Sequence, residues 1–289
     1  MRILVLGATG MLGYEVFRTC LKREVDVHAV VRNKDKVIDR LGTDVASLVH
    51  VIDDVKNITA IEKIVASVKP DYIVNCVGIV KQSGLSENYY ESVAINSFLP
   101  HQLNRLCEAH DCRLIHVSTD CVFDGVRGNY QESDLPNAYD LYGKSKYLGE
   151  VNYGKGITLR TSIIGHEITT ETHGLHEWFL AQSGKVKGFT KAIFSGFTTL
   201  ELTNIILNVI IGQALPAGLY QVAAEPISKY DLLRIIAEVY GHDIVIEPTE
   251  SLIIDRSLNA DRFNELTKYK VPGWKQMISE MRSDFNTGY

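Results

Sequence analysis

Residues 2–21, RILVLGATGMLGYEVFRTCL, form the stretch that decides the fold. The apolar run Arg2–Leu6 stops at a glycine-rich turn, and apolar residues with helical spacing follow from Tyr14 to Leu21. A strand, a glycine turn and a helix in this order make up the dinucleotide-binding unit, which binds a pyrophosphate at the N-terminus of its helix. The sequence therefore predicts an α/β fold with a Rossmann-type, doubly wound parallel sheet.

The three glycines of this turn have separate expected roles. Gly7 makes the tight turn, Gly10 lets backbone N–H groups approach the pyrophosphate, and Gly13 permits close packing of the helix on the strand. Their G-x-x-G-x-x-G spacing differs from the G-x-G-x-x-G form, but its place between a strand and a helix favours a nucleotide site over a structural turn. The cofactor contacts expected in this region are Gly7, Thr9, Gly10, Met11, Leu12 and Gly13.

The second predicted strand, Val25–Val31, ends where the cofactor ribose should lie. Arg32 follows it, and no Asp or Glu between His28 and Lys34 is present to bind a ribose 2′-hydroxyl. An arginine at this position suits a 2′-phosphate, so we expect NADPH, with NADH still open. The alternative is that Arg32 is a solvated residue at a strand end.

Two further strands, Ser47–Ile52 and Asp71–Cys76, are expected to bring more cofactor contacts to the same edge of the sheet. The contacts expected after them are Asp54, Val55, Cys76, Val77 and Gly78. The loop Ile79–Gly84, which includes Lys81, should border the nicotinamide and the substrate. A helix from Glu87 to His110 carries Asn96, a polar residue inside an apolar face, which we expect to bond the neighbouring strand ends and to lie among the cofactor contacts.

A group of small polar residues follows the predicted core strand Leu114–Val117. Ser118, Thr119 and Asp120 lie at the carboxyl end of this strand, where open α/β sheets bind ligands. The hydroxyl of Thr119 or Ser118 could hold a carbonyl oxygen. We therefore expect chemistry at this strand end.

Tyr142 and Lys146 lie four residues apart in a segment predicted to be helical through Glu150, so they share one face. A lysine charge about 4 Å from the phenol, at an effective dielectric of about 20, is worth about 4 kcal/mol, or about three pKa units. Such a shift would make Tyr142 an acid/base at neutral pH. With 14 tyrosines in the chain, about one Y-x-x-x-K is expected by chance, so a solvated helix face stays the alternative.

Composition and charge argue against several classes of protein. The 289-residue chain has 45% hydrophobic residues, a net charge of −5 and scattered basic residues, so we expect neither nucleic-acid nor membrane-surface binding. The N-terminus lacks a signal-type leader and no apolar run approaches about eighteen residues, which predicts a cytoplasmic protein. The five cysteines have no C-x-x-C spacing and are expected to be reduced core residues.

The chain beyond a sixth predicted strand, Gly156–Thr161, is expected to form a smaller C-terminal α/β lobe. We divide the chain into an NADP(H)-binding Rossmann domain, residues 1–160, and a mainly substrate-binding lobe, residues 161–289, with some elements returning to the main sheet. The elements predicted in this lobe are Thr199–Gly212, Gly218–Val222, Ser228–Tyr240 and Trp274–Met281. The irregular segment Ser162–Gly174 suits substrate recognition. His173 and His176 have no evident third ligand, so we interpret them as loop histidines and predict no metal.

The joint pattern of Gly7-x-x-Gly10-x-x-Gly13, Ser118-Thr119-Asp120 and Tyr142-x-x-x-Lys146 resembles that of the extended short-chain dehydrogenase/reductases. Within that superfamily, the chain is similar to the dTDP-4-dehydrorhamnose reductase family over nearly its full length. The segments that carry this similarity are STDCVFDG at 118–125, YGKSKYLGE at 142–150, LRTS at 159–162, GLYQVA at 218–223 and RSLNADRF at 256–263. The resemblance implies NADPH-dependent reduction of the 4-keto group of a nucleotide-activated 6-deoxyhexose, in the synthesis of surface polysaccharide precursors.

The resemblance also implies roles for individual residues. Tyr142 would protonate the carbonyl oxygen of the substrate, Thr119 would hydrogen-bond that oxygen, and Lys146 would hold the nicotinamide ribose and lower the tyrosine pKa. Further contacts are expected from Ser118 to the cofactor, and from Lys81, Asp120 and Arg256 to the nucleotide sugar.

Two departures from the family pattern leave the identity of the sugar open. The usual G-x-P-T segment is here Gly196-Phe197-Thr198-Thr199, and the usual aromatic residue after S-T-D is Cys121. A UDP-linked 2-acetamido-2,6-dideoxy-4-keto sugar would fit the same catalytic residues. A non-catalytic regulatory subunit, similar to the methionine adenosyltransferase β subunit, would keep the nucleotide pocket without turnover. A homodimer is open as well.

Overall fold

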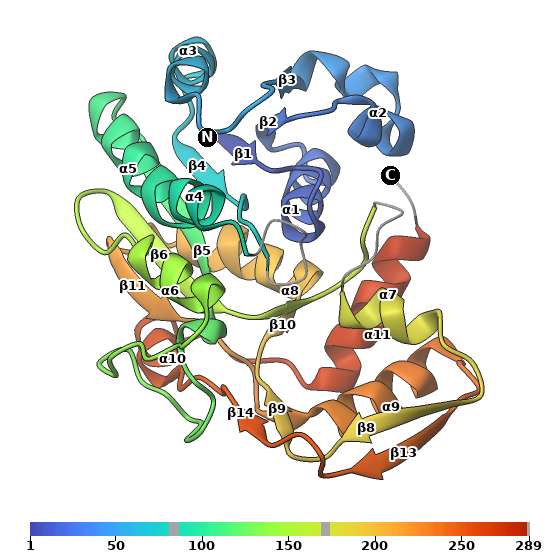
Figure 1. Cartoon of the computed structure of the whole chain (residues 1–289). Coiled ribbons are helices and arrows are strands. Elements are labelled where there is room, and N and C mark those ends of the chain that lie inside the picture. The colour runs from blue at the N-terminus through green and yellow to red at the C-terminus, as the bar shows by residue number, and fades with distance from the viewer. Residues whose placement is uncertain (81–86, 169–173, 288–289) are drawn as a thin grey trace.

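The computed structural model describes residues 1–80, 87–168 and 174–287, and its centre is a sheet of seven parallel strands (Figure 1). The strands follow the order β3-β2-β1-β4-β5-β6-β11 across the sheet. They are β1 (Arg2–Leu6), β2 (Asp26–Val31), β3 (Val49–Val51), β4 (Tyr72–Asn75), β5 (Arg113–Thr119), β6 (Gly156–Thr161) and β11 (Gly218–Gln221). The strand order reverses between β1 and β4, which creates the crevice where doubly wound sheets bind nucleotides. The predicted Rossmann-type fold is confirmed.

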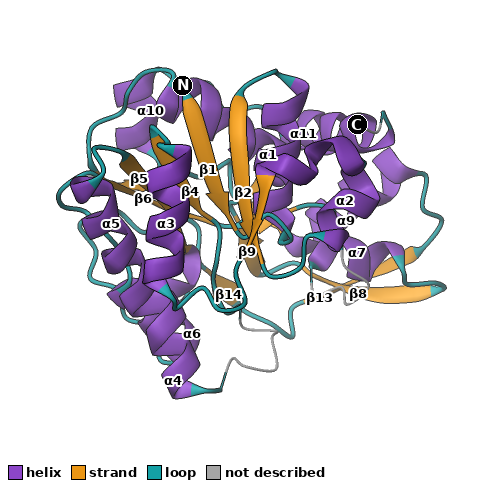
Figure 2. Cartoon of the chain, turned by 90° about the horizontal axis from the view of Figure 1, so that it is seen from above, coloured by secondary structure: helices purple, strands orange, loops and turns teal. Residues whose placement is uncertain are grey.

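Helices cover both faces of this sheet (Figure 2). On β1, Ile3 and Val5 pack in one core cluster with Phe17 of the first helix, whereas Leu4 and Leu6 pack in a second cluster on the opposite face. Burial on both faces explains why β1 is apolar at successive positions instead of at alternate ones. The helices around the sheet are α1 (Met11–Lys22), α2 (Asp35–Leu41), α3 (Ile58–Val68), α4 (Tyr89–Ser92), α5 (Leu99–Ala109), α6 (Leu141–Leu148) and α8 (Thr199–Asn204).

The long helix between β4 and β5 contains a local change of winding. A π-helical segment, Val93–Phe98, separates α4 from α5, where the sequence predicted one regular helix from Glu87 to His110. Such π segments are frequent at functional sites because the extra residue per turn re-aims nearby side chains. Here the segment carries Asn96 and Ser97, both buried.

The smaller lobe is assembled from short elements that are far apart in sequence. Its sheets pair β8 (Lys185–Phe189) with β13 (Val245–Thr249), β9 (Ala192–Phe194) with β12 (Ile227–Ser228) and β14 (Ile254–Asp255), and β7 (Ile163–Ile164) with β10 (Phe197–Thr198). Its helices are α7 (Leu175–Leu180), α9 (Lys229–Tyr240), α10 (Asp261–Thr267) and α11 (Trp274–Asn286). In the described part of the chain, no helix has the length and apolar character that crossing a membrane requires.

Two local predictions differ from the structure. The strand at Gly218–Val222 was expected to complete the smaller lobe, but β11 pairs in parallel with β6 at the edge of the main sheet. The predicted strand Ser47–Ile52 is only three residues long, since a 3-10 helix occupies Thr43–Leu48. For β11 the apolar pattern was correct, but it did not show that the partner of the strand lies in the main sheet. All five cysteines are free, as expected.

Candidate active site

The glycine turn after β1 has the shape of a phosphate cradle. Gly7 has a φ of +86°, which L side chains rarely adopt, and its carbonyl accepts the Gly10 N–H at 2.9 Å. A Cβ on Gly13 would overlap the Gly7 carbonyl oxygen, so a glycine is required for α1 to pack this closely on the turn. The first turn of α1 has no acidic residue and no side-chain cap, which leaves its N–H groups available to an anion. These features fit a dinucleotide.

The other residues predicted near this turn take different positions. Thr9 and Met11 are half-buried and Gly10 is exposed, whereas the Leu12 side chain is buried in the core, so that only its backbone could contact a ligand. Arg32 is exposed directly after β2.

Asp54 and Val55 follow β3. The Asp54 carboxylate is exposed and accepts the backbone N–H of Lys56 at 2.9 Å, which fixes a tight turn. Val55 is half-buried against the core cluster on the α3 face.

The carboxyl end of β4 contacts both the glycine turn and the predicted catalytic lysine. A Cβ on Gly7 would lie 3.0 Å from Val77, and a Cβ on Gly78 would lie 3.8 Å from Lys146 Nζ. Asn96 fixes the next residue, because its side-chain oxygen accepts the Ile79 N–H at 2.8 Å and its side-chain nitrogen donates to the Ile79 carbonyl at 3.0 Å. Asn96 therefore bonds this strand end, as the sequence predicted. Cys76 is half-buried beside Lys146.

Thr119 and Tyr142 meet at the carboxyl end of β5. Thr119 Oγ1 accepts the backbone N–H of Cys121 at 3.1 Å, and Tyr142 hydrogen-bonds to the same hydroxyl. Asp140 caps α6 by accepting the Gly143 N–H at 2.8 Å. A Cβ on Gly143 would overlap the Cys121 carbonyl, so this glycine lets the first turn of α6 approach the strand end. The sequence argument missed Gly143, although a glycine beside the candidate tyrosine is a signal for close backbone approach.

Lys146 lies one turn further along α6 and points to the backbone of the same strand. Its Nζ donates to the Val117 carbonyl at 2.7 Å, and the side chain is buried. Burial lowers the pKa of Lys146 to about 8, while the nearby Glu150 and Cys76 raise it. The tyrosine, the threonine and the lysine thus share one strand end next to the glycine turn.

One electrostatic expectation is wrong for this structure. Lys146 was expected to lower the pKa of Tyr142, but burial raises that pKa above its usual value, and the bond to Thr119 only partly opposes the change. The ammonium of Lys146 donates one of its three N–H groups to the Val117 carbonyl, and Lys146 is not among the groups that shift the pKa of Tyr142. Sequence spacing places both residues on one face but does not fix the direction of a long lysine side chain.

Ser118 and Asp120, on either side of Thr119, face different partners. The Ser118 hydroxyl donates to Glu150 Oε1 at 2.8 Å, away from the face that Thr119 and Tyr142 share. Asp120 is buried, which raises its pKa, and the nearby Arg256 opposes that rise.

Arg256 comes from the smaller lobe and reaches the same region. It is half-buried, and its Nε donates to the Phe123 carbonyl at 2.8 Å. The structure therefore brings Arg256 close to Asp120. Lys81 lies outside the described residues.

A second polar cluster lies under α7. His166 Nδ1 is 2.8 Å from Glu177 Oε1, its Nε2 is 2.9 Å from the Tyr240 hydroxyl, and His176 Nδ1 is 3.3 Å from Glu177 Oε1. Among the described residues, only His166, His176 and Glu177 gather three potential metal donors. Both nitrogens of His166 already have hydrogen-bond partners, which tie α7 to α9. The interpretation of His176 as a loop histidine is wrong, since it is buried in α7; His173 lies outside the described residues.

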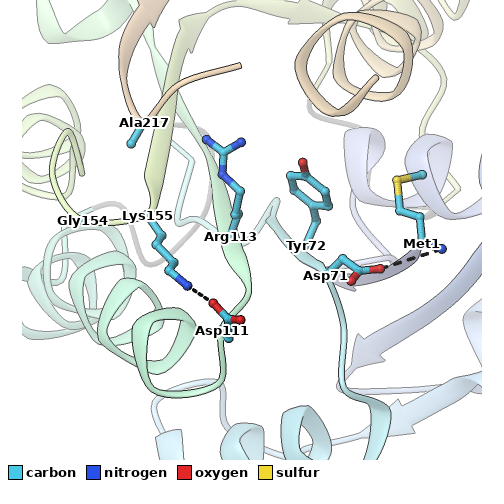
Figure 3. A pocket seen from close by; sticks show the side chains of 8 residues that line it. All are labelled: Met1, Asp71, Tyr72, Asp111, Arg113, Gly154, Lys155 and Ala217. Atoms are coloured by element: carbon cyan, nitrogen blue, oxygen red, sulfur yellow. Dashed lines mark hydrogen bonds and ion pairs between the residues drawn. The ribbon is translucent and has the colours of Figure 1, made fainter. Parts of the chain in front are cut away.

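A cavity of about 590 Å³ lies at the opposite edge of the sheet (Figure 3). Its lining includes Asp71 before β4, Arg113 at the start of β5 and Lys155 before β6. These are the amino ends of the strands, so the cavity is separate from the edge that carries Thr119 and Tyr142. Ligands of doubly wound sheets bind at the carboxyl ends, which disfavours this cavity as the active site.

Comparison with known proteins establishes the family. The family model described as the RmlD substrate binding domain matches residues 1–281. The chain belongs to this family. A relative in Haloferax volcanii, a probable low-salt glycan biosynthesis reductase named Agl14, is 28% identical over 289 residues, covering 94% of this chain and 92% of the relative. A dTDP-4-dehydrorhamnose reductase of Aggregatibacter actinomycetemcomitans is 28% identical over 242 residues, covering 80% of this chain and 76% of the relative.

Two further similarities concern the fold and a part of the chain. A crystal structure of dTDP-4-dehydrorhamnose reductase from Bacillus anthracis in complex with NADP has a TM-score of 0.79 and 20% identity, and the match covers 98% of this chain and 99% of that one. The methionine adenosyltransferase 2 subunit beta of Bos taurus is 30% identical over 156 residues, which cover 52% of this chain and 41% of that protein. Within the RmlD family, this chain is an NAD(P)-dependent oxidoreductase of the sugar-nucleotide reductase type.

Proposed function

We propose that this member of the RmlD family uses NADPH to reduce the 4-keto group of a nucleotide-activated 6-deoxyhexose, in the supply of surface polysaccharide precursors. The observation that carries the proposal is the meeting of Thr119, Tyr142 and Lys146 at one strand end, beside a glycine turn shaped for a pyrophosphate. The relatives named as reductases support the reaction class.

In this proposal each residue of the trio has one task. Bound NADPH would supply the hydride. Tyr142 donates the proton to the carbonyl oxygen, and Thr119, already bonded to the tyrosine, holds that oxygen in line. Lys146 holds the nicotinamide ribose through the N–H groups that it does not donate to the Val117 carbonyl. Because burial, together with the nearby Cys121, Asp120 and Asp140, raises the pKa of Tyr142, the tyrosine rests in its protonated form, as a proton donor requires.

The cofactor preference rests on the end of β2. Arg32 is exposed beside the predicted ribose position, where a guanidinium pairs well with a 2′-phosphate. The other proposed cofactor contacts are Asp54 and Val55, Cys76 to Gly78, and the first turn of α1. Asp120 and Arg256, with Lys81, are proposed for the nucleotide sugar.

The experiment that tests the proposed function is an assay of NADPH oxidation. The protein would be mixed with NADPH and a panel of dTDP- and UDP-linked 4-keto-6-deoxy sugars, and the loss of nicotinamide absorbance would be recorded. We expect oxidation with at least one sugar, and a rate lowered by about 10²-fold or more in the Tyr142→Phe variant. Absence of turnover with every sugar, in a protein that still binds NADPH, would contradict the proposal.

Two alternatives have specific support. The residue after S-T-D is Cys121 instead of an aromatic one, so a UDP-linked 2-acetamido-2,6-dideoxy-4-keto sugar is a second candidate, and the same panel decides between them. The match to a methionine adenosyltransferase subunit beta covers about half of this chain and keeps a non-catalytic subunit as the other alternative. Tight NADPH binding without turnover would favour that alternative.

We also propose a homodimer that forms through the long helix between β4 and β5. Tyr89, Tyr90 and Phe98 expose 73%, 73% and 59% of their surface there, and Leu148 of the adjacent α6 exposes 60%. Apolar side chains gathered on packed helices are typical of interfaces. Light scattering after gel filtration should give twice the chain mass, and the Phe98→Ser variant should give the monomer mass.

A further inference from the structure

A buried ion pair lies directly behind the catalytic strand end. Arg160 of β6 donates to Glu150 through Nε and Nη2, with both bonds 2.7 Å long. The two side chains are only 3% and 4% exposed. A buried pair of charges contributes little net stability compared with apolar residues of similar size, so its presence at this location suggests a role in function.

The carboxylate of Glu150 also holds the strand end that carries the catalytic contacts. Its Oε1 accepts the Ser118 hydroxyl at 2.8 Å. Ser118 lies between Val117, whose carbonyl accepts Lys146, and Thr119, whose hydroxyl bonds Tyr142. One carboxylate therefore links the segment after α6, the carboxyl end of β5 and the carboxyl end of β6.

Glu150 also acts on the charge of Lys146. The titratable groups that face the lysine are Glu150 on its own segment, Cys76 after β4 and His116 on β5. Burial lowers the pKa of Lys146 to about 8, and Glu150 gives the larger of the two opposing effects. His116 is fully buried with its pKa well below the usual value, so it adds no positive charge near neutral pH.

Arg160 extends the connection toward the substrate side. The centre of its guanidinium lies 5.2 Å from the centroid of the Phe123 ring. The Phe123 carbonyl accepts the Arg256 Nε, and Arg256 lies next to Asp120. The ion pair thus contacts Ser118 through Glu150 and the Phe123 ring through Arg160.

We propose that Glu150, held by Arg160, is a positioning residue of the reductase: it fixes the Ser118 strand end and keeps Lys146 in its catalytic place. This inference rests on the proposed function, because Lys146 has a task only if a dinucleotide binds there. Glu150 itself contacts neither the substrate nor the cofactor. Its effect should therefore appear in the behaviour of Lys146 and not in a lost ligand contact.

The test compares Glu150→Gln with the unmodified protein across pH 6 to 10. Removing the negative neighbour makes the ammonium of Lys146 less favourable, so the lysine loses its proton at a lower pH. We expect the alkaline limb of kcat to move to lower pH and kcat itself to fall about 10²-fold, the size of a misplacement of about 1 Å. Glu150→Asp keeps the charge, so its alkaline limb should stay in place while kcat falls.

A binding measurement makes the test independent of the sugar. The Kd of NADPH would be measured by nicotinamide fluorescence over the same pH range. As the pH is raised, the Kd should begin to increase at a lower pH in Glu150→Gln than in the unmodified protein. If no sugar is reduced but this shift is present, the proposed function fails and the positioning role stands. If Glu150→Gln does not fold, the double variant with Arg160→Gln, which leaves no unpaired buried charge, gives the same reading.

The matched control is Glu15→Gln on α1. Glu15 pairs with the buried Arg18 at 2.9 Å, away from Lys146, and Arg18 keeps a second partner, Asp284, when Glu15 is replaced. We expect a lower Tm and an unchanged alkaline limb in this control. If Glu150→Gln showed only the same loss of Tm, with unmodified kcat and unmodified pH dependence of NADPH binding, the ion pair would be structural and the proposal would be overturned.

Discussion

The carboxyl edge of the main sheet and the smaller lobe present their functional residues in different ways. At the sheet edge, Thr119 ends a regular strand and Tyr142 begins a helix capped by Asp140, so each is placed by the element next to it in sequence. In the smaller lobe, Arg256 reaches the site through a bond to Phe123, 133 residues earlier in the chain. The difference suggests that the reaction is determined by local structure and the choice of sugar by long-range packing, and the variants below test this division.

The largest effect is expected at the sheet edge. Tyr142→Phe removes the proposed proton donor and should lower kcat by about 10²- to 10⁴-fold while the Kd of NADPH stays nearly constant. Steady-state kinetics and fluorescence titration measure the two quantities. Tyr240→Phe in the smaller lobe is the matched control, because this tyrosine is also half-buried and its hydroxyl is also hydrogen-bonded to a side chain, that of His166. Equal kcat values for the unmodified protein and Tyr142→Phe would place the proton donor elsewhere.

A smaller effect is expected in the lobe. Arg256→Ala should lower kcat/KM for the nucleotide sugar by about ten- to a hundredfold, which corresponds to about 1.5 to 3 kcal/mol for one charge-assisted contact. The Kd of NADPH should not change. Arg262→Ala serves as control, because Arg262 is an exposed arginine of α10 that bonds the Leu219 carbonyl. A loss of NADPH affinity in Arg256→Ala would show that the smaller lobe also contributes to cofactor binding, which would contradict the proposed division between the two regions.

The smallest effect is expected at the end of β2. Arg32→Ala should narrow the preference for NADPH over NADH by about fivefold, because an exposed ion pair is worth about 1 kcal/mol at most. Fluorescence titration with both cofactors gives the ratio. The interaction with a 2′-phosphate is absent with NADH, so the Kd of NADH should stay the same. Equal affinities for the two cofactors in the unmodified protein would contradict the proposed interaction of Arg32 with the 2′-phosphate.

Local sequence patterns predicted the first half of the fold because each of its signals lies within one element. The run Arg2–Leu6, the glycine turn and the spacing of Tyr142 and Lys146 all depend on residues a few positions apart. The pairing of β11 with β6 does not, because Gly218–Gln221 is apolar enough for either lobe and its partner is set by the whole sheet. The same limit applies to β8 and β13, which pair although about sixty residues separate them.

At the site itself, the sequence argument missed two features for different reasons. The ion pair of Glu150 and Arg160 joins the end of a helix to a later strand, and no spacing rule connects them. The direction of Ser118 was predictable, since neighbours on a strand point to opposite faces and Thr119 already faces Tyr142. Applying that alternation would have directed Ser118 away from the substrate and toward α6.

The central claim is that the protein reduces a keto sugar that it recognises by binding the attached nucleotide. One measurement tests this claim most directly. Steady-state rates of NADPH oxidation would be recorded with a nucleotide-linked 4-keto-6-deoxy sugar and with the same keto sugar in free form. A diphosphate offers charge that residues such as Arg256 can bind away from the reacting carbon, and this remote binding places the carbonyl against Tyr142. We expect kcat/KM for the linked sugar to exceed that for the free sugar by at least about tenfold. Comparable kcat/KM values for the two forms would contradict the account.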